Sequence, residues 1–122
     1  MSFRLFVDDI RECPPGWELA RNVTDAIRIL DEQSVTEVSL DHDIQLATPS
    51  ESGALYVPVA SGETFEAVAR FIAASPGDVK RVHIHTSNPA GAVRMAQIIS
   101  ERQPHIKITR AVGKLYDDGE IL

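Results

Sequence analysis

Apolar residues along this chain gather in short runs that alternate with longer, more widely spaced patterns. Runs typical of buried strands occupy residues 3–7, 36–40, 79–84 and 106–111, with a weaker one at 17–22. Helical spacing follows Thr24, Ser61 and Asn88, which are residue types that cap helices. Pro89 suits the first helical position after Asn88, and Pro104 stops that pattern. The chain is therefore predicted to alternate strands and helices.

Strands separated by helices pair in parallel through right-handed crossovers. Four or five such strands predict an α/β fold with a doubly wound, three-layer sandwich, and residues 1–122 are expected to form one domain. Residues 44–62 show no clear period and are predicted to be an ordered loop with a short hairpin, as in lids and binding elements. Ligands in such folds bind at the carboxyl ends of the strands, near the point where strand order reverses.

Polar residues cluster at the predicted carboxyl ends of the strands. They are Asp8 and Asp9 after the first strand, Asp41, His42 and Asp43 after the third, His85, Thr86, Ser87 and Asn88 after the fourth, and Arg110 near the end of the fifth. Because the ends of parallel strands meet at one edge of a sheet, these side chains are expected to face one rim. That convergence is more informative than any single motif.

Asp8, Asp9 and Asp41 are candidate metal ligands. Neighbouring carboxylates repel one another and resist burial without a partner, and a divalent cation resolves both problems. Their hard oxygens suit Mg²⁺ or Mn²⁺. Zn²⁺ stays open because histidines lie nearby, although the spacing matches no strong zinc signature. The alternative is that these residues cap helices or end loops in solvent, but three of them on one rim favour a metal or phosphate-handling site.

His42 and His85 are candidate catalytic residues, because imidazole transfers protons near neutral pH. His83 lies two residues before His85 and is expected on the same face of its strand. For His83, further from the strand end, packing beneath a helix is the favoured interpretation.

Thr86, Ser87 and Asn88 stand where a helix begins, so free backbone N–H groups and the positive helix end are expected at the rim. Together with Arg110 they are candidate phosphate-binding residues. The alternative is an ordinary capped helix start. The chain contains no P-loop, dinucleotide fingerprint or Gly-x-Ser-x-Gly nucleophile motif.

Charge and composition limit the partners. The formal net charge of −6 argues against non-specific binding to nucleic acid or acidic membranes. A small phosphorylated ligand stays compatible with this charge, because a bound cation supplies local positive charge. The single cysteine, Cys13, excludes an internal disulfide. No apolar run approaches the roughly 20 residues of a membrane span, and the first residues are no secretory signal, so a cytoplasmic location is expected.

Three motifs together resemble the cyclic-phosphate processing receiver-like domains, which are diverged relatives of response-regulator receivers. The motifs are Leu5-Phe6-Val7-Asp8-Asp9, Ser39-Leu40-Asp41-His42-Asp43, and His85-Thr86-Ser87-Asn88-Pro89-Ala90-Gly91 with Met95. The resemblance extends over roughly residues 3–111. It implies a flavodoxin-like sheet in the order 2-1-3-4-5, with the Pro14-Pro15-Gly16 stretch in place of the first receiver helix.

By position, the resemblance implies that Asp8 and Asp9 match the receiver's metal-binding pair and Asp41 its phospho-acceptor. Thr86 or Ser87 falls near its hydroxyl position. The fifth strand departs from the pattern, because a receiver has a lysine there that contacts the phosphoryl group. This chain has Arg110 at about that place, and arginine and lysine are not equivalent phosphate partners.

The leading hypothesis is a metal-dependent phosphoesterase acting on a small phosphoester, with cyclic phosphates included. Asp41, His42 and His85 would be its catalytic residues. One alternative is a signalling receiver phosphorylated on Asp41, and another is a non-catalytic adaptor whose acidic rim binds a partner protein. Convergence of Asp8, Asp41 and His85 would favour chemistry, whereas separations beyond about 10 Å would favour the adaptor, because one cation bonds oxygen atoms at only about 2–2.6 Å.

Overall fold

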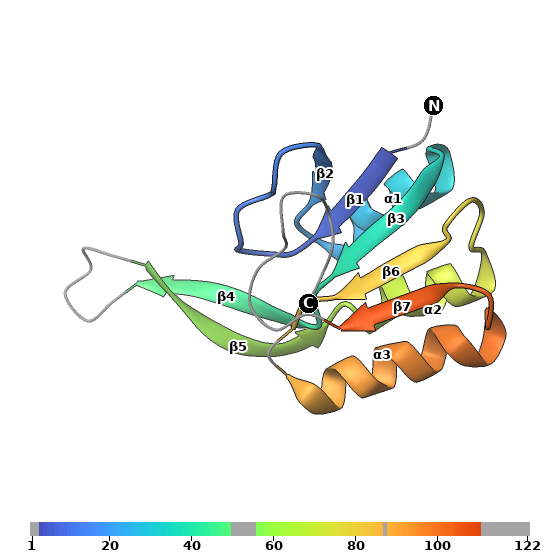
Figure 1. The fold of residues 1–122 in the computed structure, drawn as a ribbon. Coiled ribbons are helices and arrows are strands. Elements are labelled where there is room, and N and C mark those ends of the chain that lie inside the picture. The colour runs from blue at the N-terminus through green and yellow to red at the C-terminus, as the bar shows by residue number, and fades with distance from the viewer. Residues whose placement is uncertain (1–2, 50–55, 87, 111–122) are drawn as a thin grey trace.

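The computed structural model (Figure 1) describes residues 3–49, 56–86 and 88–110. Five parallel strands form its main sheet: β1 (Phe3–Val7), β2 (Trp17–Ala20), β3 (Val35–Leu40), β6 (Arg81–Ile84) and β7 (Lys107–Arg110). Their order is β2-β1-β3-β6-β7. Counted over the parallel strands alone, this is 2-1-3-4-5, which confirms the predicted α/β class and the receiver-like strand order.

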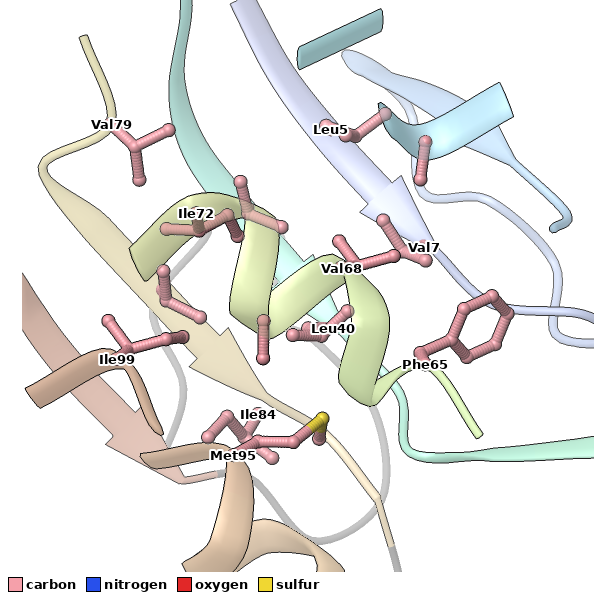
Figure 2. Close-up of a cluster of buried hydrophobic side chains, with 14 of the residues drawn as sticks. Leu5, Val7, Leu40, Phe65, Val68, Ile72, Val79, Ile84, Met95 and Ile99 are labelled. Carbon is pink, nitrogen blue, oxygen red and sulfur yellow. The ribbon is translucent and has the colours of Figure 1, made fainter. Parts of the chain in front are cut away.

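Three helices pack on one face of this sheet: α1 (Val23–Glu32), α2 (Glu66–Ala74) and α3 (Pro89–Arg102). Alternate strand residues point toward them, and Figure 2 shows Leu40 beside Val68 of α2 and Ile84 beside Met95 of α3. Burial of these apolar side chains is the main force that holds the layers together. Among the described residues no helix covers the other face, so the third layer of the predicted sandwich is not seen in this part of the chain.

The opposite face of the sheet carries mostly polar and aromatic side chains. Strand register puts them on the same side: Arg4, Phe6, Trp17, Glu37, Ser39, His83 and Thr109. The connection from β1 to β2, residues 8–16, contains no helix, as the family resemblance implied. No helix of the described residues is long and apolar enough to cross a membrane.

Two of the predicted helix caps are wrong and one is right. The cap of α1 is Asn22, whose side chain accepts the Asp25 N–H, so it precedes the expected Thr24. Ser61 lies within a strand, and α2 begins after Phe65 without a side-chain cap. Asn88 caps α3 by accepting the Gly91 N–H, with proline at the first helical position, as predicted.

Residues 43–49 and 56–64 form the two paired strands of a β-hairpin that projects from the main sheet (Figure 1). Its strands, β4 (Asp43–Pro49) and β5 (Tyr56–Thr64), pair antiparallel and make a separate two-stranded sheet. The expected loop with a short hairpin is thus mostly hairpin. Because β5 continues to Thr64, α2 starts later than its apolar pattern suggested.

Candidate functional site

The ends of the three central strands bring Asp8, Asp41 and His85 together. Each follows its strand by one residue, and backbone hydrogen bonds continue the sheet through them: Asp41 N–H donates to Val7 O at 3.0 Å, and His85 N–H to Leu40 O at 3.1 Å. One ligand atom from each of the three side chains lies within 4.8 Å of the others, and all three residues are buried. The predicted convergence of these residues is therefore present.

Asp8 is held as a carboxylate by its hydrogen bonds. Oδ1 accepts the N–H groups of Ile10 and Arg11 at 2.9 and 2.8 Å, and Oδ2 lies 2.8 Å from Nε2 of His85. Burial alone would raise the pKa of this carboxyl, but the bonds from His85, Arg11 and Ile10 outweigh it and lower the pKa.

Asp41 lies in the opposite electrostatic situation. Burial and the negative charge of Asp8 raise its pKa to about 6, although the His42 N–H donates to Oδ1 at 2.8 Å. Two neighbouring carboxylates with this little solvent repel one another unless a cation or proton neutralises one of them. The pair therefore fits a cation, because binding would relieve the repulsion.

His85 is fixed on three sides. Its Nε2 faces Asp8, its Nδ1 lies 2.7 Å from Ser39 Oγ, and the Phe6 ring stacks on it with centroids 4.8 Å apart and planes at 3°. Ser39 is fully buried. The Ser39–His85–Asp8 chain consequently orients the imidazole and leaves no hydroxyl exposed to attack a substrate.

Two carboxylates and one imidazole make a donor set that suits Mg²⁺, Mn²⁺ or Zn²⁺. Asp8, Asp41 and His85 could thus hold a metal ion. The sequence predicted Asp8, Asp9 and Asp41 as metal ligands. In the structure Asp9 is not part of this group, and His85 supplies the third potential ligand. The half-buried Asp9 follows Asp8 where the chain leaves the sheet.

His42 belongs to a second cluster, on the helix side of the rim. Its Nδ1 lies 2.6 Å from Asp43 Oδ1 and its Nε2 lies 2.8 Å from Glu66 Oε2. Burial lowers the pKa of His42, but the hydrogen bonds to Glu66 and Asp43 outweigh it and raise the pKa. Arg94 donates to Glu66 through Nε and Nη2, both at 3.0 Å. The hydrogen bonds from Arg94, and to a smaller extent from His42, lower the pKa of Glu66 to about 2.

The predicted phosphate-binding residues gather where α3 begins. Thr86 is buried, and its Oγ1 accepts the Asn88 N–H at 3.1 Å. The Asn88 amide donates to Asp43 Oδ1 at 3.2 Å, which joins this segment to the His42 cluster. Arg110 reaches the Thr86 carbonyl at 3.4 Å. Ser87 lies outside the described residues.

Four further residues shape the rim, although the sequence did not mark them as candidate site residues: Arg11, Ser39, Glu66 and Arg94. The Arg11 guanidinium donates to the His85 carbonyl and lies 3.8 Å from Asp8 Oδ2. Ser39 is the polar residue between Val38 and Leu40, and that alternation was the only hint that it faces away from the helices. Glu66 and Arg94 lie on separate helices, so only the packing of those helices reveals their pairing.

Comparison with known proteins gives one family. The model of the cyclic-phosphate processing Receiver domain matches residues 3–101 of the chain. No curated protein and no solved structure matches. The matched range contains Asp8, Asp41 and His85, together with the start of α3.

Proposed function

Because the chain belongs to the family of cyclic-phosphate processing receiver domains, we propose that it is a metal-dependent phosphoesterase for a small phosphoester, cyclic phosphates included. The observation that supports this most is the buried group of Asp8, Asp41 and His85. A cation would relieve the repulsion between the two carboxylates, and the rim where they meet is where α/β sheets bind ligands.

In this proposal Asp8, Asp41 and His85 hold the cation. A divalent cation bound there, Mg²⁺ or Mn²⁺ with Zn²⁺ as an alternative, would polarise a phosphoryl oxygen and favour ionisation of water. Arg11 supplies a further positive charge beside Asp8, with its side chain 37% exposed. The net effect of these groups is a rim that attracts an anionic ester although the whole chain is acidic.

Thr86, Asn88 and Arg110 would orient the phosphate beside the start of α3. The backbone N–H groups of a helix start and the guanidinium both favour negative charge. Asn88 already uses its side-chain oxygen to cap Gly91, so its role would be to fix the segment. Ser87 stays a predicted phosphate contact.

His42 would carry the proton in this scheme, because His85 is engaged as a ligand. Its Nδ1 faces the Asp43 carboxylate, whose side chain is 47% exposed. That carboxylate gives the buried imidazole a hydrogen-bonded route toward solvent. Glu66 on the other nitrogen keeps the ring in one orientation.

The test is hydrolysis of a panel of phosphoesters, comprising 2′,3′-cyclic, 3′,5′-cyclic and linear nucleotides, with Mg²⁺, Mn²⁺ or Zn²⁺. Asp41→Asn and His85→Ala are expected to lose about 100-fold or more in rate. Asp31→Asn changes the same charge on the exposed surface of α1 and should keep wild-type turnover. Full turnover by Asp41→Asn at saturating metal would contradict the proposal.

A second candidate function is a receiver that is phosphorylated on Asp41. It is favoured by one observation, the neighbouring Asp8 and Asp41 carboxylates at the ends of adjacent strands. Beryllofluoride with Mg²⁺ should then bind and shift the amide spectrum of the rim, and it should do so without any turnover of esters. The adaptor alternative gains nothing from the geometry, because the three side chains converge.

A further inference from the structure

Two carboxylate–histidine–hydroxyl chains lie side by side on the polar face of the sheet. In one, His85 stands between Asp8 and Ser39. In the other, His83 stands between Glu37 and Thr109. Both histidines are 1% exposed, and in both chains Nε2 faces the carboxylate while Nδ1 faces the hydroxyl. The two chains therefore allow a direct comparison of what each hydroxyl does.

We propose that Ser39 is a positioning residue that fixes His85 to bind a cation through Nε2 and in no other orientation. This inference rests on the proposed function, since it concerns the same cation site. It adds a residue that touches neither cation nor substrate and that acts through the imidazole.

The two ring nitrogens of His85 face different partners. A cation bound at Nε2 takes the lone pair there, so a neutral imidazole must carry its one ring proton on Nδ1 and no longer on Nε2, where it would be shared with Asp8. Ser39 Oγ, 2.7 Å from Nδ1, is placed to accept that proton in a hydrogen bond. Because a hydroxyl both donates and accepts, Ser39 satisfies Nδ1 with and without the cation.

Packing prevents the ring from adopting the other orientation. A half-turn of the imidazole would place carbon atoms against Ser39 Oγ and Asp8 Oδ2, leaving a fully buried hydroxyl and a buried carboxylate oxygen with worse partners. The Phe6 ring, stacked on His85, holds the plane of the imidazole. Partners of this kind on a ligand histidine raise metal affinity about 10- to 100-fold.

In the described part of the chain, the hydrogen-bonded group of Glu37, His83 and Thr109 lacks the further ligands that a cation would need. Glu37 is the carboxylate next to His83, and no group of three metal-ligating residues forms around it among the described residues. Thr109 lies at the far side of that ring, on β7. Removing the Thr109 hydroxyl takes a hydrogen-bond partner from His83, just as removing the Ser39 hydroxyl takes one from His85. It leaves the contacts of His85 unchanged.

The experiment measures cation affinity by titration calorimetry for wild type, Ser39→Ala and Thr109→Val, with Mn²⁺ and Zn²⁺ as probes. Ser39→Ala is expected to bind about 10- to 100-fold more weakly. Thr109→Val should bind like the wild type. Equal affinities of Ser39→Ala and wild type would overturn the role of Ser39 alone, whereas a wild type that binds neither probe would overturn the proposed metal site as well.

Nitrogen-15 spectra of the histidine side chains give a readout that does not depend on the stability of a variant. In the wild type with Zn²⁺, His85 should carry its proton on Nδ1. A Zn²⁺-bound His85 protonated on Nε2 would show coordination through Nδ1 and would overturn the inference. His83 should keep the same spectrum with and without Zn²⁺.

Discussion

Gly91 approaches His42 so closely that a Cβ at position 91 would lie 2.5 Å from Cγ and Nδ1 of the imidazole. The His42 ring occupies the space that any larger residue at position 91 would need. His42 follows the end of β3 and Gly91 lies in the first turn of α3, so this contact fixes the two sides of the rim against each other.

Gly91→Ala should destabilise the protein by about 1–3 kcal/mol, since overpacking costs this much in a close-packed interior. The better helix propensity of alanine, worth about 1 kcal/mol, only partly offsets that. Urea unfolding measures the loss. In a His42→Ala background the ring is gone, so the same substitution should become neutral or stabilising; equal destabilisation in both backgrounds would contradict the steric explanation.

Asp41→Asn should make the cation-free protein more stable at pH 7 by about 1–2 kcal/mol, while it weakens cation binding. Folding raises the pKa of Asp41 from 3.8 to about 6, so wild-type stability falls as pH rises through this range and the full penalty is present at pH 7. The asparagine keeps an oxygen for the His42 N–H and removes the repulsion with Asp8. The figure stays modest because residual solvent screens the charge.

The pH dependence of that gain is the check. Protonating wild-type Asp41 removes the same repulsion, so the difference in melting temperature should shrink as pH falls from 7 to 5. Added Mn²⁺ should reverse the order, raising the melting temperature of the wild type above that of Asp41→Asn. A gain that is equal at pH 5 and pH 7 would mean that charge is not its cause.

Glu66→Gln should destabilise the protein by about 1–2 kcal/mol at pH 7, because it weakens charge-assisted bonds to Arg94 and His42. The folded pKa of Glu66, about 2, lies below the unfolded value of 4.5, so this stability is present above pH 4.5 and is lost as pH falls toward 2. Thermal melts at pH 7, 4 and 3 should therefore converge for the two proteins. Glu101→Gln, on the exposed side of α3, should show no such convergence.

Arg11→Met should raise KM for a phosphoester about tenfold and change kcat less, because the charge that attracts the anion is lost while the cation ligands remain. Arg28→Met removes the same charge from the exposed surface of α1 and serves as the matched control. Steady-state kinetics at two salt concentrations test this. Equal KM values for both variants would show that Arg11 only tethers its loop to the His85 carbonyl.

Much of the fold followed from local pattern. Apolar runs located all five parallel strands, and Asn88-Pro89 marked a helix start with the right chemistry. Parallel strand ends share one edge, so the sequence alone predicts that Asp8, Asp41 and His85 lie close together. Topology alone carried that prediction.

The wrong predictions concern positions where two residues or two elements compete for the same role, and the sequence does not show which one prevails. Asn22 and Thr24 are both residue types that cap helices, and which of them caps α1 depends on where the chain leaves β2. Ser61 was a plausible cap, but pairing within the hairpin extends to Thr64. Ser39 looked like an ordinary strand residue, since its role depends on His85, which is distant in the chain and lies beside it only in the folded sheet.

The candidate cation site joins the ends of β1, β3 and β6, strands that meet only after two crossovers have closed. A cation held there would act as a removable cross-link between distant parts of the chain. Cation binding would then stabilise the folded central sheet, and loss of the cation would destabilise it. Cells short of the metal would then carry a larger unfolded fraction, and proteases act on that fraction. Abundance of the protein, and not only its activity, would follow the metal supply.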